Sequence, residues 1–212
     1  MLNKTLHIST SPHLTKGVTT VDIMKNVVYA LLPVAGYAVY AFGWDALFLL
    51  ATTTLSAVIT EHYLCMWSGK PTTVGDWSAV ITGLLLGMTL PPAFPLWMAF
   101  LGGVIAIGLG KYVFGGLGNN SFNPALVGRA VLQAAFPVAI TTWSAAFVSD
   151  RFFGVSSSLL AQPFMKPTYD AVSGATPLSA FKFDGVLTGS YELAFGMVGG
   201  STGETSAIVI LA

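Results

Sequence analysis

Two long apolar runs, at about 26–42 and 46–67, constrain the fold of this chain more than any other feature. The turn Gly43-Trp44-Asp45 separates them, and each run is close to the ~20 residues that a helix needs to cross a bilayer. Charged residues make up 8% of the sequence, although soluble proteins average about 25%. The pattern predicts an all-α, polytopic membrane protein.

The later apolar segments are shorter and contain breaks. A third segment spans about 77–90, a fourth about 95–114, and a fifth crossing is expected over 123–148 with an interruption at Pro137. The third segment, at about 14 residues, is too short to cross as one straight helix. Gly83 and Gly87 have the small-xxx-small spacing that lets helices approach closely. We therefore expect a closely packed bundle over 25–148 that includes broken or half helices.

A helix start is expected inside the fifth segment, because Asn123 suits an N-cap and Pro124 suits a first turn. The free N–H groups of such a start would favour an anionic or electron-rich ligand. Arg129 lies further along the same helix. It would either stabilise a reduced, anionic ligand or extend to the cytoplasmic headgroups, and the residues leave both interpretations open.

The distribution of lysines predicts the orientation. Short segments on one side hold Lys4, Lys16, Lys25, Lys70 and Lys111. The opposite turns hold Asp45 and an uncharged stretch at 91–95. The positive-inside rule then places the N-terminal segment 1–24 in the cytoplasm, and five crossings place the long segment 149–188 outside. Thr20 or Asp22 is expected to cap the first helix, and Glu61-His62 is expected at headgroup level.

The segment 149–188 contains the motif Asp170-Ala171-Val172-Ser173-Gly174-Ala175-Thr176. Gly174 suits a turn, and Pro177 pushes Thr176 toward an extended conformation. On the residues alone this is either an ordinary polar turn or a loop that presents the Thr176 hydroxyl. The motif resembles the flavinylation site in the membrane subunits of Rnf and Na⁺-translocating NADH:quinone oxidoreductase complexes, the NqrB/RnfD family. This resemblance implies that a flavin transferase esterifies FMN to Thr176 after reading Asp170, Ser173, Gly174 and Ala175.

A second motif, Gly200-Ser201-Thr202-Gly203-Glu204-Thr205-Ser206-Ala207, is also similar to a segment of this family. The resemblance implies two helical repeats, so that 25–148 would be the first repeat and 189–212 the start of the second. The natural chain is accordingly expected to continue past residue 212. Glu204 fits a capping box with Ser201, and could also bind a cation or line a flavin pocket.

The function implied by the resemblance is electron transport coupled to Na⁺ or H⁺ movement, in a complex of the ferredoxin:NAD⁺ oxidoreductase type. The implied cofactors are covalent FMN on Thr176 and a second, non-covalent flavin (riboflavin or FMN), with Asn123 and Arg129 as candidate contacts. Other Rnf subunits would be partners, namely a flavoprotein of the G type and iron–sulfur and membrane subunits. The continuation Pro177-Leu178 and the brief N-terminal segment favour the RnfD branch. The implied location is the bacterial cytoplasmic membrane, among lipid.

Several functions are excluded or left as alternatives. There is no Walker loop, dinucleotide fingerprint or metal-ligand spacing, so no complete catalytic or metal site is expected on this chain. Zero net charge argues against nucleic acid, and the single cysteine, Cys65, cannot hold an iron–sulfur cluster alone. The alternative is a channel or passive transporter of urea- or water-channel-like architecture, because Asn123-Pro124-Ala125 mimics a water-channel signature. A purely structural component is the third interpretation.

Overall fold

The structure, a computed structural model, describes residues 17–163, 175–204 and 206–211, and the regular secondary structure in these residues is helical throughout. Helices α1 (Thr20–Phe42) and α2 (Trp44–Trp67) are long and apolar enough to cross a membrane. The prediction of an all-helical protein built on two long apolar helices is thus confirmed for the described residues.

Helix α1 begins earlier than the sequence patterns predicted. Thr19 is its N-cap: the hydroxyl accepts the Asp22 N–H at 3.2 Å, and the Asp22 carboxylate accepts the Thr19 N–H at 3.2 Å. The expectation that Thr20 or Asp22 is the cap is therefore wrong, because Asp22 is instead the reciprocal partner in a capping box. The predicted segment 1–24 consequently contains the first turn of α1.

A one-residue turn joins α1 to α2, and only glycine fits it. Gly43 has a φ of +70°, and a Cβ built on it would lie 2.0 Å from the carbonyl oxygen of Arg151. That same carbonyl accepts the Trp44 N–H at 3.2 Å, and the Trp44 indole donates to the Phe152 carbonyl at 3.0 Å. The segment around Arg151 therefore lies directly against this end of the two long helices.

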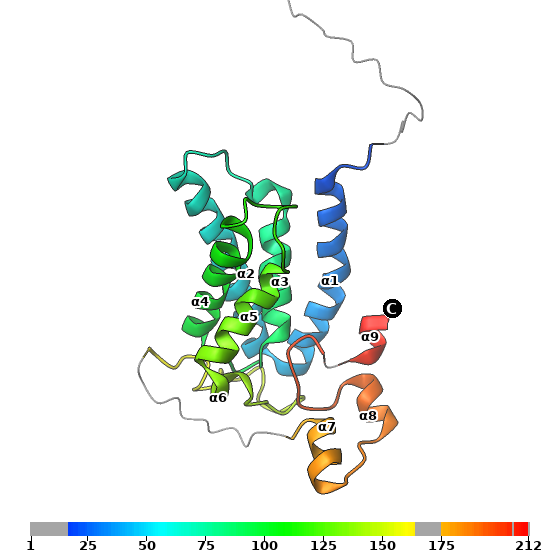
Figure 1. Cartoon of the computed structure of the whole chain (residues 1–212). Coiled ribbons are helices and arrows are strands. Elements are labelled where there is room, and N and C mark those ends of the chain that lie inside the picture. Colours follow the sequence, from blue (N-terminus) through cyan, green and yellow to red (C-terminus); the bar gives the residue numbers. More distant parts are fainter. Residues whose placement is uncertain (1–16, 164–174, 205, 212) are drawn as a thin grey trace, which may run out of the picture.

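Three shorter helices complete the bundle (Figure 1). They are α3 (Ser78–Thr89), α4 (Leu96–Ile107) and α5 (Pro124–Ala135), each of 12 residues, with a short η1 (Val74–Asp76) before α3. Helix α4 continues as a π-helical turn, η2 (Gly108–Tyr112). The prediction that 77–90 forms only a short helix is confirmed.

The expected fifth crossing over 123–148 is wrong in its second half. Pro137 ends α5, since a proline lacks the N–H of a helix interior, and the following α6 (Pro137–Ile140) is one turn long. Residues 141–163 then contain no regular secondary structure. This irregular segment meets the bundle end formed by Ala41 and Trp44, and Phe147 donates its N–H to the Ala41 carbonyl at 2.8 Å.

Glycines allow the helices of the bundle to touch. A Cβ on Gly83 would lie 2.4 Å from the Cα of Thr54, and one on Gly87 would lie 2.6 Å from the Thr53 hydroxyl. These contacts join α3 to α2 at a separation that no larger residue allows. The predicted close approach at Gly83 and Gly87 is confirmed. The core beside it is formed mainly by buried Leu49, Leu86, Leu90, Phe94, Met98 and Leu132.

We expect Gly83→Ala to lower the free energy of unfolding by about 1–3 kcal/mol, because the added methyl group meets backbone atoms that must move. Gly36→Ala in α1 is the matched control, since a Cβ there meets nothing within 4 Å. Thermal unfolding of both variants in detergent measures the difference. Equal stability of the two variants would contradict the close approach of α2 and α3.

A second group of short helices lies at one end of the bundle (Figure 1). It comprises α7 (Pro177–Ser179), the π-helical turn η3 (Ala180–Asp184), α8 (Ser190–Phe195) and α9 (Ala207–Leu211). Helix α9 packs against α1, and the Tyr37 hydroxyl of α1 donates to the carbonyl of Phe195. The predicted loop 149–188 therefore contains short helices in its described part.

Candidate functional site

Thr176 occupies a defined position at the start of α7. Its φ of −66° and ψ of 153° are extended, as predicted for a residue before proline, and Pro177 is the first residue of the helix. The Thr176 hydroxyl accepts the N–H of Ser179 at 3.3 Å. The side chain is half-buried, so its hydroxyl is held in place as an N-cap while remaining accessible.

The rest of the motif can be followed only in part. Asp170, Ser173 and Gly174 lie outside the described residues. Ala175 is exposed next to Thr176. The structure therefore describes the predicted acceptor hydroxyl and the residue before it, and the predicted recognition by a transferase stays a prediction.

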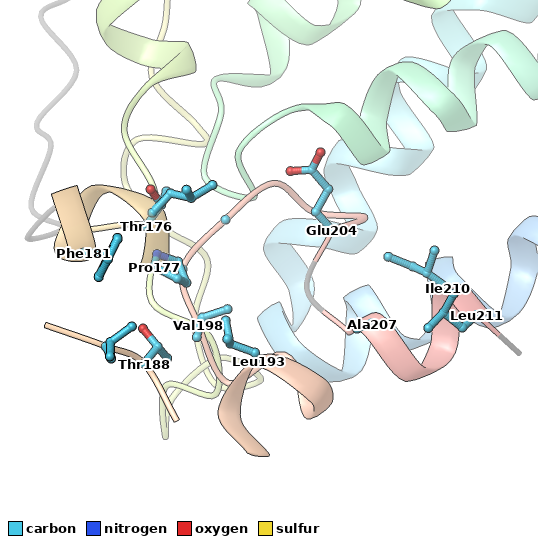
Figure 2. Close-up of a pocket in the computed structure, with 14 residues that line it drawn as sticks. Thr176, Pro177, Phe181, Thr188, Leu193, Val198, Glu204, Ala207, Ile210 and Leu211 are labelled. Carbon is cyan, nitrogen blue, oxygen red and sulfur yellow. The ribbon is translucent and has the colours of Figure 1, made fainter. Parts of the chain in front are cut away.

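A cavity of about 800 Å³ opens beside Thr176 (Figure 2). Its walls come from α7 and η3, from the segment before α8, from 198–204 and from α9. Most lining side chains are apolar, and the polar ones are Thr176, Thr188 and Glu204. An apolar cavity of this size with a few polar groups suits a planar aromatic ring with a polar edge. The residues present thus fit the isoalloxazine of an FMN attached at Thr176.

One wall of this cavity is fastened to the helix bundle. Thr202 donates its N–H at 3.0 Å and its hydroxyl at 2.7 Å to the Leu90 carbonyl, and Gly203 donates its N–H to the Met88 carbonyl at 2.7 Å. Both carbonyls belong to the C-terminal end of α3, whose last carbonyls lack partners within the helix. The segment 201–203 therefore caps α3 across more than a hundred residues of sequence.

Arg129 binds the same end of α3. Its guanidinium donates to the Thr89 carbonyl at 2.8 Å from a half-buried position on α5. A cation at a helix C-terminus also counters the negative end of the helix dipole. The Arg129 guanidinium thus bonds to backbone of the bundle, at the end of α3 opposite to the end where Lys111 pairs with Glu61, and both predicted roles of Arg129 stay predictions.

Glu204 is not part of a capping box. Helix α9 begins at Ala207, and its first turn is capped by Ser206, whose hydroxyl accepts the Val209 N–H at 3.4 Å. Glu204 precedes this cap and lies in a turn, where its N–H donates a hydrogen bond to the Ser201 carbonyl at 3.2 Å. The expected capping box with Ser201 is therefore wrong, and Glu204 is an exposed residue at the edge of the Thr176 cavity (Figure 2).

The predicted helix start at Asn123 is confirmed. The Asn123 side chain accepts the Ala125 N–H at 3.0 Å, and Pro124 is the first residue of α5. A cavity of about 280 Å³ lies at this helix start and is lined by several polar side chains. Those polar residues are Ser78, Thr82, Lys111, Asn120 and Asn123.

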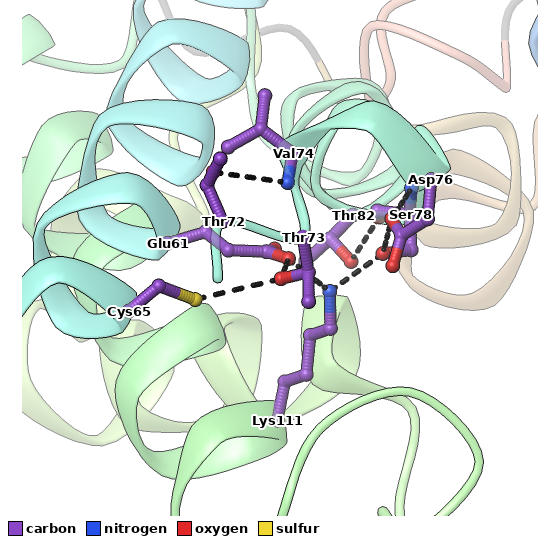
Figure 3. A network of polar contacts seen from close by, with 9 residues as sticks. All are labelled: Glu61, Cys65, Thr72, Thr73, Val74, Asp76, Ser78, Thr82 and Lys111. Carbon is purple, nitrogen blue, oxygen red and sulfur yellow. Dashed lines mark hydrogen bonds and ion pairs between the residues drawn. The ribbon is translucent and has the colours of Figure 1, made fainter. Parts of the chain in front are cut away.

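A buried ion pair joins the C-terminal part of α2 to η2 (Figure 3), at the end of the bundle away from α7 (Figure 1). Lys111 donates to both carboxylate oxygens of Glu61 at 2.7 Å and to the Ser78 hydroxyl at 2.5 Å. Thr73 donates to the same carboxylate, and Cys65 contacts Thr73 at 3.5 Å. The Glu61 side chain is 2% exposed and that of Lys111 is 5% exposed.

The sequence patterns do not reveal this pair, because its two members lie 50 residues apart in separate helices. Glu61 does not face headgroups beside His62: it points into the bundle, whereas His62 is exposed. Lys111 is not a free loop charge, because the π-helical turn η2 directs it toward Glu61. One feature of the sequence could have indicated the pair. Glu61 and Lys111 are an acidic and a basic residue within separate apolar segments, and such residues are expected to pair.

The sequence matches the model of the NQR2, RnfD, RnfE family over residues 7–212. It is 40% identical to the D-subunit of the proton-translocating ferredoxin:NAD(+) oxidoreductase complex of Clostridium ljungdahlii, over 96% of this chain and 59% of that protein. It is also 40% identical to the D-subunit of the Na(+)-translocating ferredoxin:NAD(+) oxidoreductase complex of Acetobacterium woodii, over 97% of this chain and 60% of that protein.

A third relative is the D-subunit of the ion-translocating oxidoreductase complex of Rhodobacter capsulatus, which is 38% identical over 94% of this chain and 59% of that protein. The chain spans about 60% of the length of these relatives. Two of them differ in the ion that their names give, although their identity to this chain is the same. The match of nearly the whole sequence to one family model leads to a single conclusion: the chain belongs to the NQR2, RnfD, RnfE family.

Proposed function

We propose that the chain forms part of the RnfD component of an Rnf-type ferredoxin:NAD⁺ oxidoreductase complex, with FMN attached to Thr176. The observation that carries the proposal is the Thr176 hydroxyl, held as an N-cap at the edge of an apolar cavity of about 800 Å³. Family membership and the three relatives support the assignment to this complex.

Different residues of the cavity would bind different parts of FMN. Thr176 would hold the phosphate, and the apolar side chains around it, such as Phe181 and Leu193, would cover the ring. When bound, FMN supplies one-electron transfer, and the protein supplies its position and electrostatic surroundings. Thr202 and Gly203 would keep one wall of the cavity in place through their bonds to α3.

A second, non-covalent flavin would bind at the start of α5. The cavity there presents the side chains of Asn120 and Asn123 at the positive end of the helix dipole, which suit an electron-rich ligand. Arg129 does not line this cavity. We assign to Arg129 a positioning role, since it shares the end of α3 with the segment 201–203 that borders the Thr176 cavity.

The orientation in the bacterial cytoplasmic membrane would place residues 1–24 in the cytoplasm and 149–188 outside. Lys25 and Lys70 lie at the opposite end of α1 and α2 from Asp45, which supports this orientation even without Lys111. The flavin transferase would then act outside. Other Rnf subunits, including the G-type flavoprotein, would supply and remove electrons, coupled to Na⁺ or H⁺ movement.

Complementation tests this function. The full-length protein is expressed in a bacterium that lacks its own RnfD gene, and ferredoxin-dependent NAD⁺ reduction is measured in inverted membrane vesicles. We expect the wild-type protein to restore the activity and Thr176→Ala to restore at most a small fraction of it. The proposal is contradicted if inserted, flavinylated protein restores nothing, or if both proteins restore equal activity.

A further inference from the structure

Four aromatic side chains form an exposed cluster beside the turn that joins α1 to α2. The indole of Trp44 stacks on Phe48 with ring centroids 6.0 Å apart, and it meets Phe152 edge-on at 6.5 Å. Phe153, the next residue, is 93% exposed. These four side chains, the aromatic cluster, line a cavity of about 280 Å³. Clustered exposed apolar groups mark a contact with an apolar partner such as a membrane.

Trp44 indicates the depth of the aromatic cluster relative to a bilayer. Helix α2 has 24 residues and is therefore about 36 Å long, somewhat more than the ~30 Å of the hydrocarbon core. It begins at Trp44 and ends at Trp67, both exposed, and tryptophan is enriched at both membrane interfaces. The Trp44 indole donates to the Phe152 carbonyl at 3.0 Å, so Phe152 lies at nearly the same depth.

The irregular segment that carries Phe152 and Phe153 is bonded internally. The carbonyls of Arg151 and Phe152 both accept hydrogen bonds from Trp44, at 3.2 and 3.0 Å. The Phe153 N–H donates to the Asp150 carbonyl at 2.8 Å. Non-helical backbone beside lipid needs such partners, because lipid tails provide none. The segment is therefore held in place and is suited to contact with lipid.

The charge of Arg151 is also accommodated within this region. Its guanidinium donates to the carbonyls of Tyr40 and Val148, at 2.9 and 3.1 Å. It lies over the rings of Tyr40, Phe147 and Phe152, with distances to the ring centroids of 5.6, 5.4 and 5.1 Å. Such cation–π contacts strengthen where water is excluded. An arginine held in this way suits the border between headgroups and hydrocarbon.

The aromatic cluster continues an exposed apolar face of α2. Trp44, Phe48, Leu55 and Ile59 are all exposed, and their spacing places them on one side of the helix. Helix α2 is long and apolar enough to cross a membrane. Lipid is therefore the occupant that both this face and the aromatic cluster at its end favour.

We propose that the aromatic cluster inserts into the membrane interface and that its cavity binds part of a lipid acyl chain. The first part of the segment 149–188 is thus embedded in the surface of the bilayer instead of lying in the aqueous phase. It anchors the turn between α1 and α2 at that depth. The inference requires insertion of the chain in a membrane, and it does not depend on FMN at Thr176.

Site-directed spin labelling tests the inference on the full-length protein, purified with the subunits that bind to it and reconstituted in liposomes. Native cysteines, Cys65 among them, are replaced by serine, and a nitroxide is attached at Phe153→Cys. Collisions with oxygen report lipid, and collisions with a water-soluble nickel chelate report water. Ser149→Cys is the matched control, because Ser149 is an exposed polar residue of the same segment. Leu55→Cys, on α2, gives the reference for lipid.

We expect the ratio of oxygen to nickel collisions at Phe153 to be several times that at Ser149 and to approach the ratio at Leu55. A label at Phe153 that meets the nickel chelate as often as the label at Ser149 lies in water and overturns the inference. A label that meets neither reagent is covered by protein, which also overturns it. Phe153 is almost fully exposed, so its replacement leaves the fold intact.

The result is separate from the proposed function. The collision ratio is measured in the same way whether or not the protein carries covalent flavin. Failure of flavinylation at Thr176 would therefore contradict the proposed function and leave the lipid contact of Phe153 to be decided by the label.

Discussion

Thr176→Ala is expected to abolish flavin fluorescence from the protein band on a denaturing gel, when the full-length protein is expressed with its flavin transferase. The substitution removes the only oxygen through which a phosphate can be esterified at this position. The hydroxyl also caps α7, but losing a cap costs about 1 kcal/mol, and α7 has only three residues. The loss of flavin would therefore not result from unfolding.

The same cavity provides the control for this experiment. Thr188 is also a threonine and lines the same cavity, so Thr188→Ala makes an identical chemical change beside the proposed position of the flavin ring. We expect it to keep the fluorescence, and Thr176→Ser to keep part of it. Fluorescence in Thr176→Ala would mean that the flavin is attached elsewhere. Its absence from every variant and from the wild type, with an active transferase, would contradict covalent attachment.

Lys111→Ala is expected to lower the free energy of unfolding by about 3–5 kcal/mol, because it leaves the buried Glu61 carboxylate without its counter-charge. Thermal unfolding in detergent, followed by size-exclusion chromatography, measures this loss. Lys70→Ala is the control at the same end of the bundle. Lys70 is exposed and contacts the ring of Tyr112 at 5.7 Å, so its removal should change stability by less than about 1 kcal/mol.

The double variant Glu61→Leu, Lys111→Met gives the sharper result. Replacing a complete buried ion pair by apolar residues is often neutral or stabilising, so we expect stability near that of the wild type. The single change should therefore be far more damaging than the double change. Additive losses in the two variants would show that the pair is not coupled as the distances of 2.7 Å indicate.

The long helices and their closest contacts could be predicted from the sequence because local rules decide them. The apolar runs identified α1 and α2, the spacing of Gly83 and Gly87 identified the approach of α3 to α2, and Asn123-Pro124 identified the start of α5. The extended Thr176 followed from Pro177 alone. Each of these features depends on residues within a few positions of one another.

The features that the sequence patterns missed depend on distant residues. Lys111 was counted as a loop charge because nothing near it in sequence indicates Glu61 as its partner. Glu204 fitted a local capping rule, but Thr202 and Gly203 bond to α3 and no helix starts at Ser201. Arg129 had two interpretations, and neither included the Thr89 carbonyl. Hydrogen bonds between residues distant in sequence fix the local geometry in all three cases.

The cap on α3 has a consequence for the order in which the molecule is made. The carbonyls of Met88 and Leu90 leave the ribosome more than a hundred residues before Thr202 and Gly203, which bond to them. Throughout that part of synthesis the carbonyls of Met88 and Leu90 lack these hydrogen-bond partners. The wall of the Thr176 cavity that includes residues 198–204 forms only when these hydrogen bonds form, although Thr176 is translated first. The proposed attachment of FMN to Thr176 in the finished cavity would therefore follow the synthesis of residues 202 and 203.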